Sequence, residues 1–218
     1  MTIDLARRVD PGPVVGIDLS SQVISEASAT ARTAGAPNVT FLTGDFRSTT
    51  LAPASFDVVH AHQVLQHLRD PVDALVAMRG LARPGGIVAA RDSDYSAMTW
   101  SPASRSLERW LEIYLAVTAR NGADANAGRW LARWAQQAGF DEVAYTASRW
   151  TFATPSDVSW WAELWAERTV ASSFARQAVD YGIATTDELA TVATGWRTWA
   201  AEAGAAFVVP HGEVIAQA

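Results

Sequence analysis

Cysteine and lysine are both absent from this chain of 218 residues. Without cysteine the chain has no disulfides and no thiolate metal ligands, which fits a reducing compartment, so we expect a cytoplasmic protein. The 17 basic side chains are all arginine and are outnumbered by 23 acidic ones, a net charge of −6. This charge argues against nucleic acid as the main partner. We interpret the arginine-only, alanine-rich composition as the coding bias of a GC-rich bacterial gene.

A long apolar run is also missing. A membrane helix needs roughly 20 consecutive apolar residues, and no segment approaches that length, so we expect no membrane span. The first ten residues carry four charges and do not resemble a signal peptide. Hydrophobic residues make up 49% of the chain and charged residues 18%, which favours a folded globular protein over a disordered one.

Tryptophan does not occur before position 100, although the chain has ten of them. The part before that position alternates short β-branched runs with helical stretches, which is typical of βαβ units and a parallel sheet. Strands are predicted at 13–18, 39–43, 56–61 and 86–91, and helices at 20–33 and 70–81.

The second half places its tryptophans and leucines at helical spacing, with strand-like segments at 142–152 and 206–215. Pro210 should restrict the closing strand to a sheet edge or a bulge. We predict an α/β protein with a doubly wound, mostly parallel sheet and an antiparallel late strand. Residues 1–153 plus 205–218 would form the core, and 154–204 a Trp-rich helical insertion that acts as a lid.

Two carboxylates follow predicted strands. Asp18 ends one strand, and Gly44-Asp45-Phe46 ends the next. Because ligands of open parallel sheets bind at the carboxyl ends of the strands, Asp18 could accept both hydroxyls of a ribose. Asp45 could accept the amino group of an adenine, with Phe46 against the ring. The plainer alternatives are that Asp18 caps the next helix and that Asp45 only forms a turn.

Three histidines, His60, His62 and His67, lie close together in the sequence. The only acidic neighbour that could support a metal ligand is Asp70, so we expect no metal site. His62 or His67 could act as a general base toward a substrate hydroxyl, and His67 is our candidate catalytic residue. We expect His211 only to pack.

Four stretches together resemble the class I S-adenosylmethionine-dependent methyltransferases, specifically the small-molecule type related to the quinone-biosynthesis C-methyltransferases. These stretches are residues 14–20, 44–46, 56–68 and 81–86. The likeness covers residues 2–95 well and continues more loosely to the end.

The resemblance implies a Rossmann-like methyltransferase fold, S-adenosylmethionine as cofactor, and methyl transfer to a small, apolar acceptor molecule. It implies that Asp18 and Leu19 contact the ribose of the cofactor, and that Asp45 and Phe46 contact the adenine. It also implies that His62 and Gln63 contact the methionine part. One to three of the tryptophans, and Tyr95, would line the acceptor cavity. The tryptophan-rich helices could equally form the face of a homodimer.

The sequence departs from the family pattern at its start. The family has a first strand and a glycine-rich loop, whereas this chain begins inside the helix that should follow, with no glycine before Gly12. We expect a gene that begins upstream of Met1. Two alternatives remain: an inactive methyltransferase-like interaction module without the loop, and an NAD-dependent dehydrogenase. The dehydrogenase lacks support because a chain without lysine has no Tyr-x-x-x-Lys pair.

Overall fold

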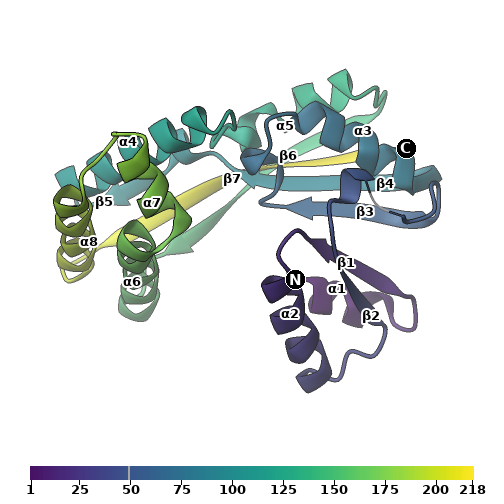
Figure 1. Cartoon of the computed structure of the whole chain (residues 1–218), viewed down its shortest axis with the longest axis horizontal. Coiled ribbons are helices and arrows are strands. Elements are labelled where there is room, and N and C mark those ends of the chain that lie inside the picture. Colours follow the sequence, from purple (N-terminus) through teal and green to yellow (C-terminus); the bar gives the residue numbers. More distant parts are fainter. Residues whose placement is uncertain (49) are drawn as a thin grey trace. The chain divides into compact units, whose positions relative to one another are not determined.

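A computed structural model describes residues 1–48 and 50–218 (Figure 1). The chain divides into two compact units, Met1–Pro53 and Ala54–Ala218, called here the N-terminal unit and the C-terminal unit. Each unit is described by itself.

The N-terminal unit contains a two-stranded parallel sheet and helices. Its elements are α1 (Thr2–Val9), β1 (Val14–Asp18), α2 (Ser21–Thr33), β2 (Val39–Thr43) and η1 (Phe46–Ser48). The Oγ of Ser20 accepts the Val23 N–H at 3.3 Å and so begins α2. Since β1 and β2 run parallel, with Asp18 opposite Thr43, both strands end at the same edge of the sheet.

The C-terminal unit is built on a mixed sheet. Its elements are β3 (Phe56–His62), η2 (Leu65–His67), α3 (Pro71–Leu81), β4 (Ala82–Ser93), η3 (Tyr95–Ala97), β5 (Thr99–Ser101), α4 (Arg105–Arg120), α5 (Ala127–Gln137), β6 (Val143–Phe152), α6 (Pro155–Ala171), α7 (Ser173–Asp180), α8 (Thr186–Ala200) and β7 (Ala206–Gln217). β3 and β4 are parallel, while β7 is antiparallel to β4, β5 and β6. Among the described residues, β1 pairs only with β2 and β3 only with β4.

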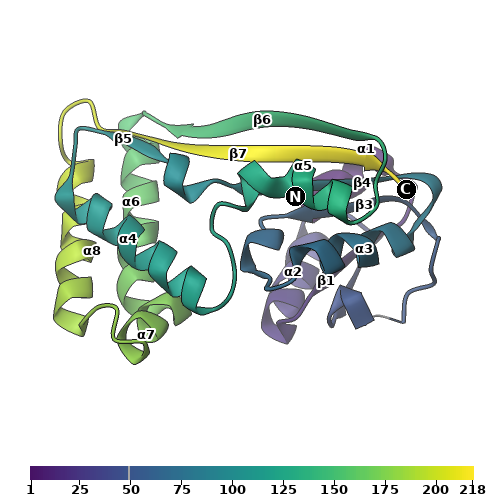
Figure 2. The ribbon, with the colours of Figure 1, turned by 90° about the horizontal axis from the view of Figure 1, so that it is seen from above.

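The α/β class and the antiparallel late strand are confirmed, but the expected position of Pro210 at an edge or a bulge is wrong. β7 lies between β4 and β6 (Figure 2). On one side, however, residues 211–217 pair with β4 and residues 206–208 with β5. Pro210 lies in the gap between these two pairings, where its missing N–H interrupts no ladder, and its carbonyl accepts the Asp94 N–H at 3.0 Å.

Buried aromatic rings form the core of the helical part of the C-terminal unit. α4, α6, α7 and α8 gather around one end of β7 (Figure 2). Trp110 packs edge-to-face on Trp165 and on Trp196, with ring centroids 4.5 and 5.0 Å apart. The indole N–H groups of all three lack hydrogen-bond partners among the described residues. Edge-to-face packing lets such groups point at neighbouring π faces, a weaker substitute for a hydrogen bond.

Helices α4 and α8 cross at small residues. A Cβ built on Gly195 of α8 would overlap Cβ and Oγ of Ser106 of α4. Glycine at this position therefore sets the close approach of the two helices, and with it the contact between Trp110 of α4 and Trp196 of α8.

The segment 154–204 contains α6, α7 and α8. Its separation from the rest as a lid remains a prediction. No helix in the described part of the chain combines the length and apolar character needed to cross a membrane.

Candidate functional site

Asp18 ends β1 with its side chain exposed. Its Oδ1 accepts the Ser20 N–H at 2.8 Å, while Oδ2 makes no hydrogen bond to the described residues. The Gly44 N–H donates to the Asp18 carbonyl at 2.9 Å, which ties the end of β1 to the turn that carries Asp45. Ser20, and not Asp18, accepts the helical N–H at the start of α2. Asp18 thus keeps a carboxylate oxygen open to a ligand.

Leu19 and Phe46 supply apolar surface in the same unit. Leu19 is 70% exposed, which is unusual for a leucine, and Phe46 is half-buried in η1. Leu19 follows Asp18 and Phe46 follows Asp45, both at the carboxyl ends of strands, where a flat ring could contact them.

Asp45 is already paired. Arg47, which the sequence reasoning missed, donates through Nη2 to Asp45 Oδ2 at 2.6 Å and through Nε to Oδ1 at 3.0 Å. These hydrogen bonds lower the pKa of the Asp45 carboxyl below its usual value. Asp45 is therefore an acceptor held in place by Arg47. Three donors of Arg47, its backbone N–H, Nε and Nη2, bind this carboxylate, which has about four lone-pair sites, so about one site is left for an amino group.

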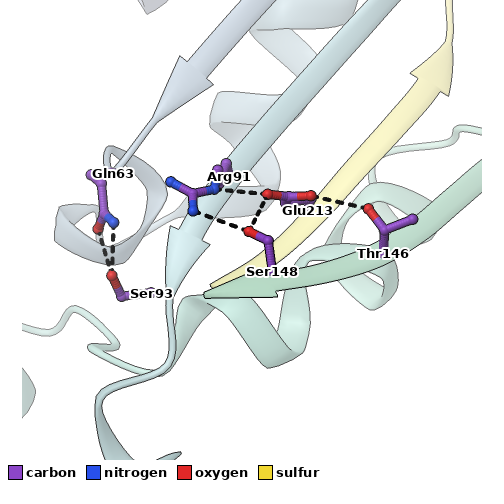
Figure 3. A network of polar contacts seen from close by, with 6 residues as sticks. All are labelled: Gln63, Arg91, Ser93, Thr146, Ser148 and Glu213. Atoms are coloured by element: carbon purple, nitrogen blue, oxygen red, sulfur yellow. Dashed lines mark hydrogen bonds and ion pairs between the residues drawn. The ribbon is translucent and has the colours of Figure 1, made fainter. Parts of the chain in front are cut away.

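In the C-terminal unit, Gln63 follows β3 in a left-handed backbone conformation, with φ +58°. Its N–H donates to the Arg91 carbonyl at 2.8 Å. Its side-chain Nε2 donates to Ser93 Oγ at 2.7 Å (Figure 3). Non-glycine residues rarely adopt this conformation, and strained residues of this kind cluster at functional sites.

His62 stacks on Trp150, with ring centroids 5.9 Å apart. Burial and the nearby Arg91 guanidinium lower the pKa of His62 to about 4. The imidazole is therefore neutral at pH 7 and able to accept a hydrogen bond. His67, the candidate catalytic residue, ends η2, and partial desolvation lowers its pKa. A neutral imidazole at this position is compatible with a base, but the role remains a prediction.

A network of polar side chains lies on the same sheet face as His62, because His62, Arg91 and Glu213 are cross-strand neighbours. Arg91 donates to Glu213 at 2.8 Å and to Ser148 at 3.0 Å, and Thr146 donates to Glu213 at 3.1 Å (Figure 3). Sequence reasoning missed this network because its members come from β4, β6 and β7, and only strand pairing brings them together.

Asp92, also missed, is fully buried on the opposite face of β4. One carboxyl oxygen accepts the Gln66 N–H of η2 at 3.2 Å, and the other has no hydrogen-bond partner among the described residues. Burial raises the pKa of the Asp92 carboxyl to about 7. Perturbed carboxyl groups at the ends of strands are candidates for functional sites.

The remaining histidines form no metal cluster within the described residues. His60 and His62 have ring centroids 6.3 Å apart. His211 is buried and packs on Trp150 at 4.4 Å, as expected from its place in the closing strand.

Comparisons with known proteins identify the family of this chain. Residues 1–147 match the profile of the family described as "Methyltransferase domain". An uncharacterized methyltransferase of Schizosaccharomyces pombe is 26% identical over 99% of this chain and 79% of its own. The ubiquinone biosynthesis O-methyltransferase of Methylococcus capsulatus is 30% identical over 58% of this chain and 53% of its own.

A solved structure supports the same fold. Phosphoethanolamine N-methyltransferase 2 of Haemonchus contortus, in complex with S-adenosylhomocysteine, superposes with a TM-score of 0.55 at 16% identity. The alignment covers 98% of this chain and 45% of that one, so this chain spans less than half of that relative. With a family match that covers more than half of its length, the chain belongs to the S-adenosylmethionine-dependent methyltransferases of Rossmann-like α/β fold.

Proposed function

We propose that this methyltransferase acts on a small, mainly apolar acceptor, and that Asp18 and Asp45 bind the adenosine part of S-adenosylmethionine. The observation that carries the proposal is the parallel pairing of β1 with β2. This pairing ends both strands at one edge, and the Gly44 N–H bond to the Asp18 carbonyl fixes the Asp45 turn beside Asp18.

The residues present are suited to an adenosine. The open Oδ2 of Asp18 is an acceptor for ribose hydroxyls, and Asp45, held by Arg47, is an acceptor for the adenine amino group. The exposed Leu19 and the half-buried Phe46 offer apolar contact to the adenine ring. When bound, S-adenosylmethionine supplies a methyl group activated by its sulfonium.

His62 and Gln63 are proposed to contact the methionine part of the cofactor. The neutral His62 ring accepts hydrogen bonds without adding a positive charge, and the hydrogen bonds of Gln63 hold its backbone in a fixed turn. For the transfer itself the protein has mainly to align the acceptor and exclude water. His67 is the proposed base where the acceptor must lose a proton.

The apolar acceptor is proposed from the family likeness. Tyr95, expected to line the acceptor cavity, is instead buried in the aromatic core and stacks on Tyr114, with ring centroids 4.2 Å apart. A quinone-like acceptor is one member of this class, suggested by the partial likeness to the Methylococcus enzyme. From the cysteine-free, arginine-only composition we also propose a cytoplasmic, bacterial protein.

Calorimetric titration with S-adenosylhomocysteine tests the adenosine site. Asp18→Asn should weaken binding about tenfold, because an amide accepts ribose hydroxyls less strongly than a carboxylate. The control is Asp4→Asn, whose carboxylate is also exposed and lies in the same unit but on α1. Equal affinity of Asp18→Asn and the unaltered chain would remove the ribose role. A folded chain that binds neither S-adenosylhomocysteine nor NAD would instead favour the interaction module.

A further inference from the structure

Asp92 and Ser93 are consecutive residues at the end of β4, and their side chains point to opposite faces of the sheet. Both bind the segment that follows β3. Asp92 accepts the Gln66 N–H at 3.2 Å, and Ser93 Oγ contacts both polar atoms of the Gln63 amide, at 2.7 and 2.9 Å.

The segment itself closes the arrangement into a ring. Gln66 Nε2 donates to Gln63 Oε1 at 2.6 Å. The path therefore runs from the Asp92 carboxyl through Gln66 and Gln63 to Ser93, which is bonded covalently to Asp92. A closed ring of hydrogen bonds restricts its members more than the same bonds in an open chain, because no member can rotate alone.

The ring surrounds the strained residue. Gln63 has a φ of +58°, a left-handed backbone conformation that is strained for a non-glycine residue. Such a conformation persists where surrounding contacts over-determine it. Gln63 is fixed by the Arg91 carbonyl on its backbone and by Ser93 and Gln66 on its side chain.

The surroundings of Asp92 indicate a role other than charge pairing. Asp92 has no ion-pair partner in the described part of the chain, and its second oxygen and the Gln66 Oε1 are both buried without partners. The titratable group beside it is the phenol of Tyr95. The η2 amides of Leu65 and Gln66 face the Asp92 carboxyl, while Gly128 of α5 packs against the Asp92 backbone carbonyl. A buried carboxyl is costly unless its oxygens are paired or hydrogen-bonded.

We propose that Asp92 is a positioning residue for methyl transfer: together with Ser93 it holds the 63–67 segment so that Gln63 keeps its left-handed turn toward the methionine part of the cofactor. The inference rests on the proposed cofactor contacts of Gln63. Asp92 itself touches η2 and acts only through Gln66 and Gln63.

Conservative rescue separates positioning from general destabilisation. Asp92→Asn keeps the oxygen that accepts the Gln66 N–H and replaces the unpartnered second oxygen by an amide nitrogen. Asp92→Ala removes both. We expect Asp92→Ala to bind S-adenosylhomocysteine about tenfold more weakly and Asp92→Asn to stay within about twofold. Asp94→Asn, two residues along and paired with Arg129 outside the ring, is the matched control and should not change affinity.

Amide hydrogen exchange gives a readout that does not depend on the cofactor. The Gln66 N–H should exchange faster in Asp92→Ala than in Asp92→Asn or Asp94→Asn. Unchanged affinity of a folded Asp92→Ala for S-adenosylhomocysteine would overturn the proposal, and unchanged exchange would show that Asp92 does not hold the segment. If Asp92→Ala does not fold, Ser93→Ala opens the ring from its other side, and the same losses are expected, with the Gln63 side-chain amide released.

The two proposals can fail separately. If the unaltered chain does not bind S-adenosylhomocysteine, the proposed adenosine site is refuted, and the exchange measurement alone decides on the ring. If the unaltered chain binds and Asp92→Ala binds equally well, the ring is not a positioning device, while the adenosine site stands.

Discussion

Gly195→Ala is the sharpest test of the packing in the C-terminal unit. The substitution adds one methyl group in α8, where it would overlap Cβ and Oγ of Ser106 of α4. Since Cβ is attached directly to the backbone, Ser106 cannot move away by changing rotamer alone. The two helices must separate, and the edge-to-face contact of Trp110 with Trp196 must loosen with them.

The expected magnitude follows from two opposing effects. Replacing a helical glycine by alanine stabilises a helix by up to about 1 kcal/mol, whereas overpacking a tight contact costs about 1–3 kcal/mol. We expect Gly195→Ala to lower the free energy of unfolding by up to about 2 kcal/mol. The control, Gly80→Ala in α3, has open space around its added methyl group and should show only the stabilisation.

Urea unfolding followed by tryptophan fluorescence is the assay. All ten tryptophans lie in the C-terminal unit, so the signal reports on that unit. The two variants should differ by about 1–3 kcal/mol, with Gly80→Ala the more stable. In a thermal scan this corresponds to about 2–4 °C for each kcal/mol.

A second substitution checks the cause. Ser106→Gly removes the side chain that the new methyl group meets, so the double variant Gly195→Ala/Ser106→Gly should recover most of the loss. In a double-mutant cycle, the two substitutions together should cost less unfolding free energy than the sum of their separate costs. The reasoning is refuted if Gly195→Ala is stabilised as much as Gly80→Ala, or if Ser106→Gly does not relieve it.

Three further predictions concern the C-terminal unit. Trp110→Ala should cost about 3–5 kcal/mol of unfolding free energy in a denaturant titration, while Trp130→Ala, at a residue 36% exposed, should cost far less. Arg91→Met should lower the free energy of unfolding by about 1–3 kcal/mol because it leaves the half-buried Glu213 without its cation. The control Arg83→Met breaks an exposed pair with Asp57 and should cost under about 0.5 kcal/mol. Equal losses in the two variants would contradict the importance of the network. Burial lowers the pKa of His211 to about 4 from an ordinary 6.5. Between these two pH values the unfolded chain binds a proton that the folded chain does not, so His211 makes the free energy of unfolding rise with pH. The free energies of unfolding at pH 4.5 and pH 7 should therefore differ less in His211→Gln than in the unaltered chain.

Much of the fold was accessible from the sequence because its signals are local. Ser20 caps α2, Pro71 begins α3, and the β-branched runs form β1 to β3. Each depends on residues within a few positions of one another, where capping and alternation act. Pro210 misled because its effect depends on which strand lies beside it, and the change of partner along β7 is a property of the whole sheet.

The site divides in the same way. Asp18 and Asp45 follow strands, and this position is visible in the sequence. The Arg47 pair was overlooked, although an arginine two residues after a turn aspartate was a readable signal. Asp92 and Glu213 were not readable at all, since a buried carboxyl and a cross-strand partner 122 positions from Arg91 are defined only by tertiary pairing.

The strands β1 and β3 each have a single strand neighbour within the described residues. The other edge of each strand carries amide and carbonyl groups that do not pair with a strand in the described part of the chain. These groups need hydrogen bonds to water or to another backbone. We therefore expect purified protein to add foreign strands at unpaired edges of this kind. Light scattering across a dilution series is the way to detect such association before affinities are measured.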